Sequence, residues 1–242
     1  MKLILHTKRK AVAMIELIFA IVIMGIALMS APTLISQAGK GGLSVTQQEA
    51  IVAGSTQIGM IMTRAWDEAD TNDSDTNPIL VVDEDIDALN ETTDADGNGT
   101  GKRIGIPRLA SRSFLTSSGQ RLHATPIGNE DGEYDDIDDF DNNSTKLVEI
   151  SVSQEGDYID TSLELNTTVK YIDTTTSDDS YTSTTIQYDS PFSLATSNPT
   201  TNVKVISVNV SSGTHKDVLD TNITLKAFMC NIGTYTLKTK DF

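Results

Sequence analysis

The acidic segment around residue 95 carries the side chains whose spacing best fits metal chemistry. Asp94, Asp96 and Asn98 alternate, and Gly99 follows as the sixth residue of an Asp-x-Asp-x-Asn-Gly pattern. This is the first half of an EF-hand loop, in which alternating oxygen ligands wrap a calcium ion. The twelfth position is Gly105 and not the bidentate Glu. The prediction is therefore either a calcium site at Asp94, Asp96 and Asn98 or an acidic loop without a metal, and calcium is the one cofactor suggested.

A second acidic run and the histidines carry less chemistry. Eight of the twelve residues from Glu130 to Asp141 are Asp or Glu. We interpret Asp135–Asp141 as a solvated face or a second weak cation site. His123 and His215 have no Cys or Ser motif near them, and the sequence has no HExxH, phosphate loop or nucleophile elbow. The prediction is that the chain is not an enzyme and has no catalytic residue.

Glu16 is the remaining candidate. It is the only ionisable residue in an apolar run from Val12 to Ala31, which follows Lys8, Arg9 and Lys10. A carboxylate in a membrane-spanning segment costs about 2.5–3.5 kcal/mol on insertion scales and is by default functional. On membrane physics alone, Glu16 either has a partner or reaches the nearby headgroups by snorkelling.

These residues resemble the N-terminal signal of type IV prepilins and type II secretion pseudopilins. The shared order is basic residues, a small residue, then an apolar helix with Glu at its fifth position; Met14–Leu17 and Gly25 also match. The resemblance implies cleavage by prepilin peptidase between Ala11 and Val12, N-methylation of Val12, and a role for Glu16 in assembly. It further implies other pilin or pseudopilin subunits and an inner-membrane assembly platform as partners.

Composition limits the other partners. Lys and Arg number 18 against 34 Asp and Glu, and loss of residues 1–11 would remove four of the basic residues. So acidic a surface repels nucleic acid and anionic lipid heads, so we expect no nucleic-acid partner. Cys230 is the only cysteine, which excludes an intramolecular disulfide and a Cys-based zinc site.

An ordinary secretory signal is the alternative reading of the first 31 residues. Its apolar region spans about 7–15 residues, shorter than the run here, although Ala27 and Ala31 could serve in a cleavage site. A plain signal anchor is also possible. Under either reading the basic residues hold the N-terminus in the cytoplasm, and the chain after Lys40 lies outside. We expect a single-pass inner-membrane protein, on a filament or the cell surface after assembly.

Helical periodicity predicts the elements that must carry these residues. The membrane-spanning helix is expected over 12–38, a bend or melted turn at Gly39–Gly42, and an amphipathic helix over 43–66. Its Met60, Met62 and Trp66 end is expected to be a core face on a sheet. Residues 67–145 are expected to form an acidic variable loop region, with a short strand at Ile79–Val82.

Residues 146–242 alternate as strands do. Candidate strands begin at Val148, Leu163, Val203 and Ile223, and a weaker one spans Tyr181–Tyr188. The strand Val203–Val210 changes phase, as a bulge near Val205 would allow. Short strands joined by polar turns predict an antiparallel sheet, and with the preceding helix an α+β fold.

This order resembles pilins and pseudopilins as well. The block Tyr134–Phe140, followed by C-terminal strands, resembles minor pilins of the mannose-sensitive haemagglutinin type. Two function classes stay open. One is a minor pilin or pseudopilin subunit of a type IV pilus or type II secretion pseudopilus. The other is a stand-alone, signal-anchored surface domain, such as a calcium-dependent adhesin or sensor.

Overall fold

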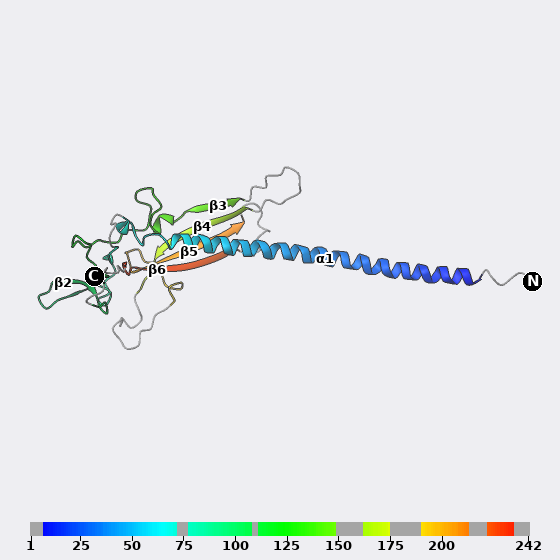
Figure 1. Cartoon of the computed structure of the whole chain (residues 1–242), viewed down its shortest axis with the longest axis horizontal. Helices are drawn as coiled ribbons and strands as arrows, with labels where there is room; N and C mark the ends of the chain where they lie inside the picture. The colour runs from blue at the N-terminus through cyan, green and yellow to red at the C-terminus, as the bar shows by residue number, and fades with distance from the viewer. Residues whose placement is uncertain are drawn as a thin grey trace, which may run out of the picture. The chain divides into compact units, whose positions relative to one another are not determined.

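The protein has an α+β fold in which one N-terminal helix contacts a four-stranded antiparallel sheet, as the sequence predicts (Figure 1). The computed structural model describes residues 7–71, 77–107, 111–148, 162–174, 190–212 and 222–234. For residues 7–12 and 148 only the backbone is described. The chain divides into two compact units, Met1–Glu49 and Ala50–Phe242.

The helix α1 is continuous from Thr7 to Ile61. The bend expected at Gly39–Gly42 is wrong, because these residues are helical. Each glycine weakens a helix by about 1 kcal/mol relative to Ala. A break would instead leave up to four C=O groups unpaired before it and up to four N–H groups unpaired after it. The helical segments before and after Gly39–Gly42 therefore keep these glycines helical. Pro32 likewise lies inside the helix.

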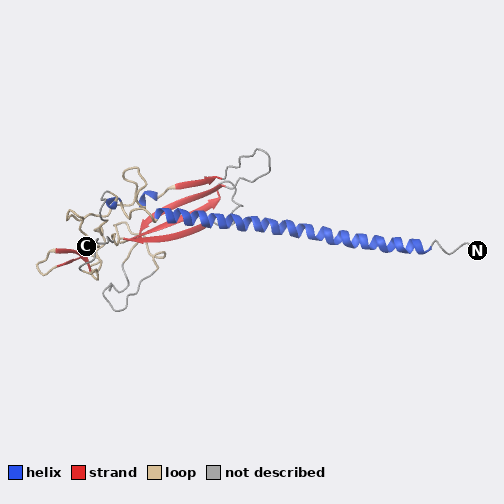
Figure 2. Ribbon diagram, in the orientation of Figure 1, coloured by secondary structure: helices blue, strands red, loops and turns tan. Residues whose placement is uncertain are grey.

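The last three turns of α1 form part of the second unit and cover the sheet (Figure 2). Ala50, Gly54, Ile58 and Ile61 are buried there, at spacings of four, four and three that place them on one side of the helix. Gly54 lets the helix approach closely, since a Cβ at this position would lie 2.7 Å from Leu225 Cδ1.

The helix ends five residues before Trp66, so the predicted end near Trp66 is wrong. Met60 and Met62 are 41% and 42% exposed, which also corrects their assignment to a core face. Trp66 alone of the three enters the core. It does so from the irregular segment after α1, where its ring packs edge-on against Tyr171 with centroids 6.1 Å apart.

The sheet has the strand order β3-β4-β5-β6, and every neighbouring pair is antiparallel. The strands are Ser144–Val148, Ser162–Tyr171, Val203–Ser212 and Ile223–Cys230. Alternate residues of β4 and β5 point into the core, and the inward row of β6 is half-buried. The predicted strands at 163–171, 203–210 and 223–229 are confirmed.

Strand β5 contains no bulge near Val205, which corrects that prediction. Its pairing with β4 is regular from Leu163↔Ser212 to Tyr171↔Lys204. Its inward row is therefore one phase throughout, and the residue that begins this row is Lys204. Val203 and Val205 lie on the opposite face because successive strand residues alternate.

The region between α1 and the sheet contains more structure than expected. Strands β1 (Glu91–Thr93) and β2 (Gly99–Arg103) form a two-stranded antiparallel sheet. Two short 3-10 helices, η1 (Glu68–Asp70) and η2 (Asp138–Phe140), flank this region. The strand predicted at Ile79–Val82 is reduced to a single bridge between Val81 and His123. The candidate strand Tyr181–Tyr188 lies outside the described residues, as do Ile150 and Val152.

Candidate functional site

The first 23 described side chains of α1, residues 13–35, are apolar except for Glu16, Ser30 and Thr33. Their large apolar members, from Met14 to Ile35, are between 51% and 81% exposed. Residues 13–35 extend for about 35 Å at 1.5 Å per residue, slightly more than the roughly 30 Å of a bilayer's hydrocarbon core. In the described part of the chain, α1 is the helix long and apolar enough to cross a membrane. A single helix of this kind at the N-terminus suggests a membrane anchor or a signal.

Glu16 lies on this apolar helix between Ile15 and Leu17, and its side chain is exposed. It is the only ionisable residue among residues 13–39. Ala11 and Val12 are part of the backbone of α1, but their side chains lie outside the described part. The predicted cleavage and methylation site therefore precedes Glu16 on the same continuous helix.

The second unit contains a feature that the sequence analysis missed, which we call the buried ion cluster: Asp67, Asp138, Tyr171 and Lys204. Lys204 Nζ lies 2.9 Å from Asp67 Oδ2 and also contacts Asp138 Oδ1, and all three side chains are fully buried. The ammonium donates a further hydrogen bond of 2.9 Å to the carbonyl of Trp66. Its three N–H donors are thereby satisfied, as a buried charge requires.

Each residue of the buried ion cluster comes from a different element. Asp67 is the N-cap of η1, Asp138 opens η2, Tyr171 ends β4, and Lys204 lies directly opposite Tyr171 on β5. The Tyr171 hydroxyl lies 3.1 Å from Asp67 Oδ2 and 2.8 Å from the Thr125 carbonyl, so its one proton is within reach of both acceptors. The cluster thus fastens the segment after α1, the loop at 125 and the acidic run to the sheet.

Two aromatic rings enclose the ammonium. Lys204 Nζ lies 4.5 Å from the centroid of Trp66 and 5.1 Å from that of Tyr171. A cation over an aromatic face is attracted by the ring's quadrupole, most strongly when water is excluded. The two rings therefore contribute apolar packing to the core and also stabilise the buried Lys204 ammonium electrostatically.

The acidic run Asp135–Asp141 is mostly buried, so its interpretation as a solvated face is wrong. Asp136, Asp138 and Asp139 are 0–3% exposed. Backbone N–H groups offset their burial: Asp136 Oδ1 accepts from Asp138 and Asp139, and Asp139 Oδ2 accepts from Asp135 and Asp136. The backbone N–H groups of this turn donate to its own carboxylates, and Lys204 supplies a positive charge. Together they allow so acidic a sequence to be buried.

Burial raises the pKa of the carboxyls around the buried ion cluster. It raises the pKa of Asp70 to about 7, with the charge of Asp67 adding to the effect and Lys204 opposing it. Burial and the neighbouring Asp138 likewise raise the pKa of Asp136. The pKa of Asp138 is raised by burial against the opposing effect of Lys204. Asp70, Asp136 and Asp138 therefore hold protons to higher pH than free carboxyls do.

The predicted calcium ligands Asp94, Asp96 and Asn98 lie at the exposed turn between β1 and β2. Asp94 Oδ1 accepts hydrogen bonds from the backbone N–H groups of Asp96 and Asn98, at 3.0 and 2.8 Å. Gly97 adopts a positive φ of 82° within this turn. The pattern therefore encodes a tight hairpin connection, and calcium binding by it stays a prediction.

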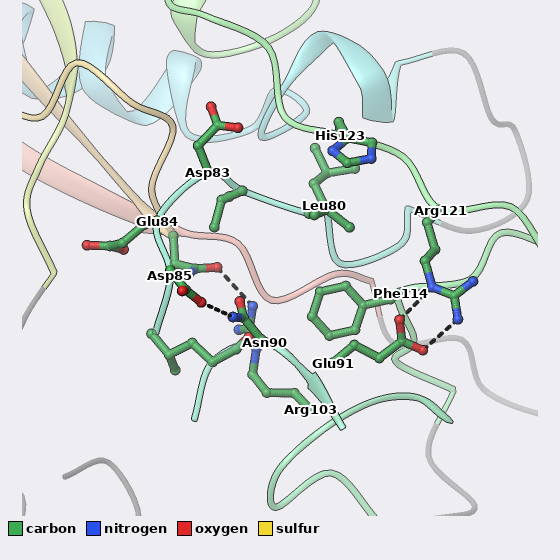
Figure 3. A pocket seen from close by; sticks show the side chains of 14 residues that line it. Leu80, Asp83, Glu84, Asp85, Asn90, Glu91, Arg103, Phe114, Arg121 and His123 are labelled. Atoms are coloured by element: carbon green, nitrogen blue, oxygen red, sulfur yellow. Dashed lines mark hydrogen bonds and ion pairs between the residues drawn. The ribbon is translucent and has the colours of Figure 1, made fainter. Parts of the chain in front are cut away.

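A cavity of about 450 Å³ is lined mainly by the segment 80–91, together with Arg103 of β2, Phe114, Arg121, His123 and Asn202 (Figure 3). Arg103, one of the lining residues, donates to Leu89 O, Asn231 O and Asn202 Oδ1, at 2.6, 3.1 and 2.9 Å. Arg121 also lines the cavity, and its Nη2 lies 2.8 Å from Glu91 Oε1. These arginines are engaged by the protein itself, so they stabilise the loops around the cavity. His123 also lines the cavity and is exposed.

Comparisons with protein-family models, with curated proteins and with solved structures found no match to this chain.

Proposed function

We propose that this chain is a minor pilin or pseudopilin subunit, processed by prepilin peptidase and assembled into a type IV pilus or type II secretion pseudopilus. The observation that carries the proposal is the composition of α1. One continuous helix combines an exposed apolar N-terminal half, in which Glu16 is the single carboxylate, with a C-terminal part that covers an antiparallel sheet.

Exposure of so many large apolar side chains supports burial of this half in lipid or against other helices. Contiguous apolar surface of this extent is rare on soluble monomers and marks membrane or protein contacts. A bilayer buries these apolar side chains before assembly, and the same segments of neighbouring subunits bury them afterwards. The partners are then prepilin peptidase, other pilin or pseudopilin subunits and the inner-membrane assembly platform.

Glu16 gains a partner through the proposed cut. Cleavage between Ala11 and Val12 creates an α-amino group with a reference pKa of about 7.7–8.0, four residues before the carboxylate. Opposite charges attract far more strongly in a low-dielectric layer than in water, and each alone is costly there. Pairing of Glu16 with the amine of a neighbouring subunit neutralises both charges and sets the axial register of adjacent helices.

The first test is mass spectrometry of the mature N-terminus from isolated membranes. The proposal expects a chain that begins at Val12, with or without a methyl group. A chain that begins after Ala27 or Ala31 would identify an ordinary secreted protein. A chain that retains Met1 would favour the signal-anchored surface domain.

The second test replaces Glu16 with Val in cells that hold no other copy. Insertion and cleavage should continue, because the segment becomes more apolar, whereas incorporation into sheared surface filaments should be lost. Glu49→Val is the matched control, since Glu49 is an exposed acid of the same helix outside the apolar run. Incorporation of Glu16→Val at the wild-type level would show that Glu16 is an interfacial residue without an assembly role.

A further inference from the structure

The cavity of about 450 Å³ beside the segment 80–91 holds charged groups that its own side chains do not neutralise. Its charged lining consists of two arginines and four acids, namely Arg103, Arg121, Asp83, Glu84, Asp85 and Glu91 (Figure 3). Arg121 pairs with Glu91, whereas none of the ion pairs in the described part of the chain involves Arg103. We propose that this cavity binds a free α-amino acid with an apolar side chain, whose carboxylate lies against Arg103 and Asn202 and whose ammonium group lies against Asp85.

Arg103 is a cation whose partners, among the described residues, are neutral. Its Nε donates to the Leu89 carbonyl, and its two terminal nitrogens donate to the Asn231 carbonyl and to Asn202 Oδ1. A guanidinium has five N–H donors, so two are left after these three bonds. Burial lowers the pKa of Arg103 to about 10, as expected for a buried cation without a neighbouring carboxylate. A planar carboxylate is the group that best matches the remaining donors of this fork.

Asn202 supplies an independent observation. It lines the cavity and is only 5% exposed. Its Oδ1 accepts from Arg103 and also from Asn231 Nδ2 at 3.1 Å, which fixes the orientation of the amide. Its Nδ2 is buried and has no acceptor in the part of the chain that the structure describes. Buried donors without acceptors are rare in native proteins, and a ligand carboxylate beside Arg103 would provide the acceptor.

The net charge of the cavity disfavours a simple anion. Four carboxylates against two guanidinium groups leave an excess of two negative charges among the lining residues. An anion would therefore be repelled by the acids while it is attracted by Arg103. A cation alone would leave the spare donors of Arg103 and Asn202 unused. A zwitterion, which carries both charges, meets both requirements.

Asp85 is held close to Arg103 by one short stretch of chain. Its Oδ1 accepts from Asn90 Nδ2 at 3.2 Å, and no ion pair of the described residues includes it. The preceding residue, Leu89, accepts from Arg103 Nε through its carbonyl at 2.6 Å. Leu89 and Asn90 thus bring a guanidinium and an acid to the same part of the cavity. An α-amino acid carries its two charges on either side of a single carbon, which suits a donor and an acceptor held this closely.

The remaining lining is largely apolar. It includes Leu80, Val82, Leu89 and Phe114. Ligand cavities of about 300–1,000 Å³ typically combine apolar walls with a few placed polar groups. A cavity of about 450 Å³ lies near the lower end of this range, which favours a single amino acid over a longer peptide. We therefore expect a side chain such as that of leucine, methionine or phenylalanine. This site lies in the second unit and does not depend on the assembly role proposed for Glu16.

The experiment is equilibrium dialysis of the full chain in detergent against radiolabelled L-leucine, L-methionine and L-phenylalanine, one at a time. At least one of them should bind, with one site per chain. Two derivatives of the same amino acid then serve as competitors: the N-acetyl form lacks the ammonium charge, and the amide lacks the carboxylate. Each should compete roughly tenfold less well or worse, because each loses a hydrogen bond between charged groups.

Asn202→Asp is the first variant to test. It keeps the oxygen that accepts from Arg103 and Asn231, and it replaces the unpartnered Nδ2 by a carboxylate oxygen. Arg103 thereby gains a counter-charge inside the protein, and no hydrogen bond within the described chain is lost. The variant should stay folded, which the fluorescence of Trp66 checks, whereas amino-acid binding should weaken roughly tenfold or more.

Asp85→Asn is the second variant, and it removes the charge that faces the ammonium group. Asp85 is exposed, so its substitution does not endanger the fold, and binding should again weaken roughly tenfold or more. Asp87→Asn is the matched control, since Asp87 is an exposed acid of the same loop that does not line the cavity. It should bind as the wild type does.

Three results would overturn the proposal. The first is that none of the three amino acids binds at millimolar concentration. The second is that the N-acetyl form or the amide competes as well as the free amino acid, which would show that one charge suffices. The third is that folded Asn202→Asp or Asp85→Asn binds with the affinity of the wild type, which would place the ligand elsewhere.

Discussion

Asp70 should make the unfolding free energy of the second unit, Ala50–Phe242 (the sheet unit), depend on pH. Replacing Asp70 with Asn should remove this dependence. It is the last residue of η1 and is 6% exposed, and its Oδ1 has no hydrogen-bond partner among the described residues. Burial and the charge of Asp67 raise its pKa to about 7 from an ordinary 3.8. Asp70→Asn keeps the shape of the side chain and removes its titration.

The sign follows from the direction of the shift. A raised pKa means that the folded chain holds a proton that the unfolded chain has released, so the contribution of Asp70 is fully present below pH 3.8 and is lost as the pH rises through 7. At 1.36 kcal/mol per pKa unit the whole loss is about 4 kcal/mol, of which about 3 kcal/mol falls between pH 5 and pH 9. Between pH 5 and pH 9 the wild type should therefore lose about 3 kcal/mol of unfolding free energy that the Asp70→Asn variant does not lose.

The assay is urea unfolding of the full chain in detergent, followed by the fluorescence of Trp66. This is the only tryptophan of the sequence, and it is buried beside the cluster, so it reports on the sheet unit and not on the apolar half of α1. Asp87→Asn, an exposed acid on another loop, is the control and should show no such change. A constant difference between Asp70→Asn and wild type from pH 5 to pH 9 would refute the assignment of a raised pKa to Asp70.

Two further substitutions, each compared with a control substitution, test how the core is held together. Lys204→Met leaves Asp67 and Asp138 buried without their cation, so it should cost about 3–5 kcal/mol of unfolding free energy at pH 8. Lys170→Met on β4 breaks an ion pair with Asp141 in which the lysine is half-exposed, and Asp141 keeps the Val169 N–H as a partner, so the loss should be less than about 1 kcal/mol. Equal losses would contradict the role of the buried ion cluster. Gly54→Val should destabilise by about 1–3 kcal/mol through overpacking against Leu225 and Val210. Gly59→Val, in open space, should change stability by less than about 0.5 kcal/mol, and urea unfolding distinguishes the two.

The sequence predicts the sheet well because its strands alternate. Leu163, Leu165 and Val169 on β4, and the inward row of β6, follow the period of two that a half-buried strand requires. The sequence also predicts that α1 is a helix. It does not predict that the helix continues through Gly39–Gly42, because the low helix propensity of glycine is a local property, whereas the cost of ending the helix depends on the whole element.

The buried ion cluster escaped prediction because charge patterns alone place acids in solvent. One signal was present: extending the inward row of Ile206, Val208 and Val210 back by two residues reaches Lys204. The change of phase at Val205 suggested a bulge, whereas the regular register demands a buried lysine. A buried lysine requires carboxylate partners, and the acidic block Tyr134–Phe140 is a source of them in the sequence. The partners come from loops of no fixed period, so their identity required the structure.

The buried ion cluster also has a consequence for the order in which the chain matures. Lys204 follows Asp67 by 137 residues and Asp138 by 66 residues. At a synthesis rate of roughly 5–20 residues per second, Asp67 waits on the order of 10 seconds or more for its cation. During that time the acidic segments are hydrated and repel one another, which opposes premature collapse and aggregation of the unfinished chain. We therefore expect the second unit to be completed late, because long-range pairings such as this one form slowly, and we expect a nascent chain that stops before β5 to remain unfolded.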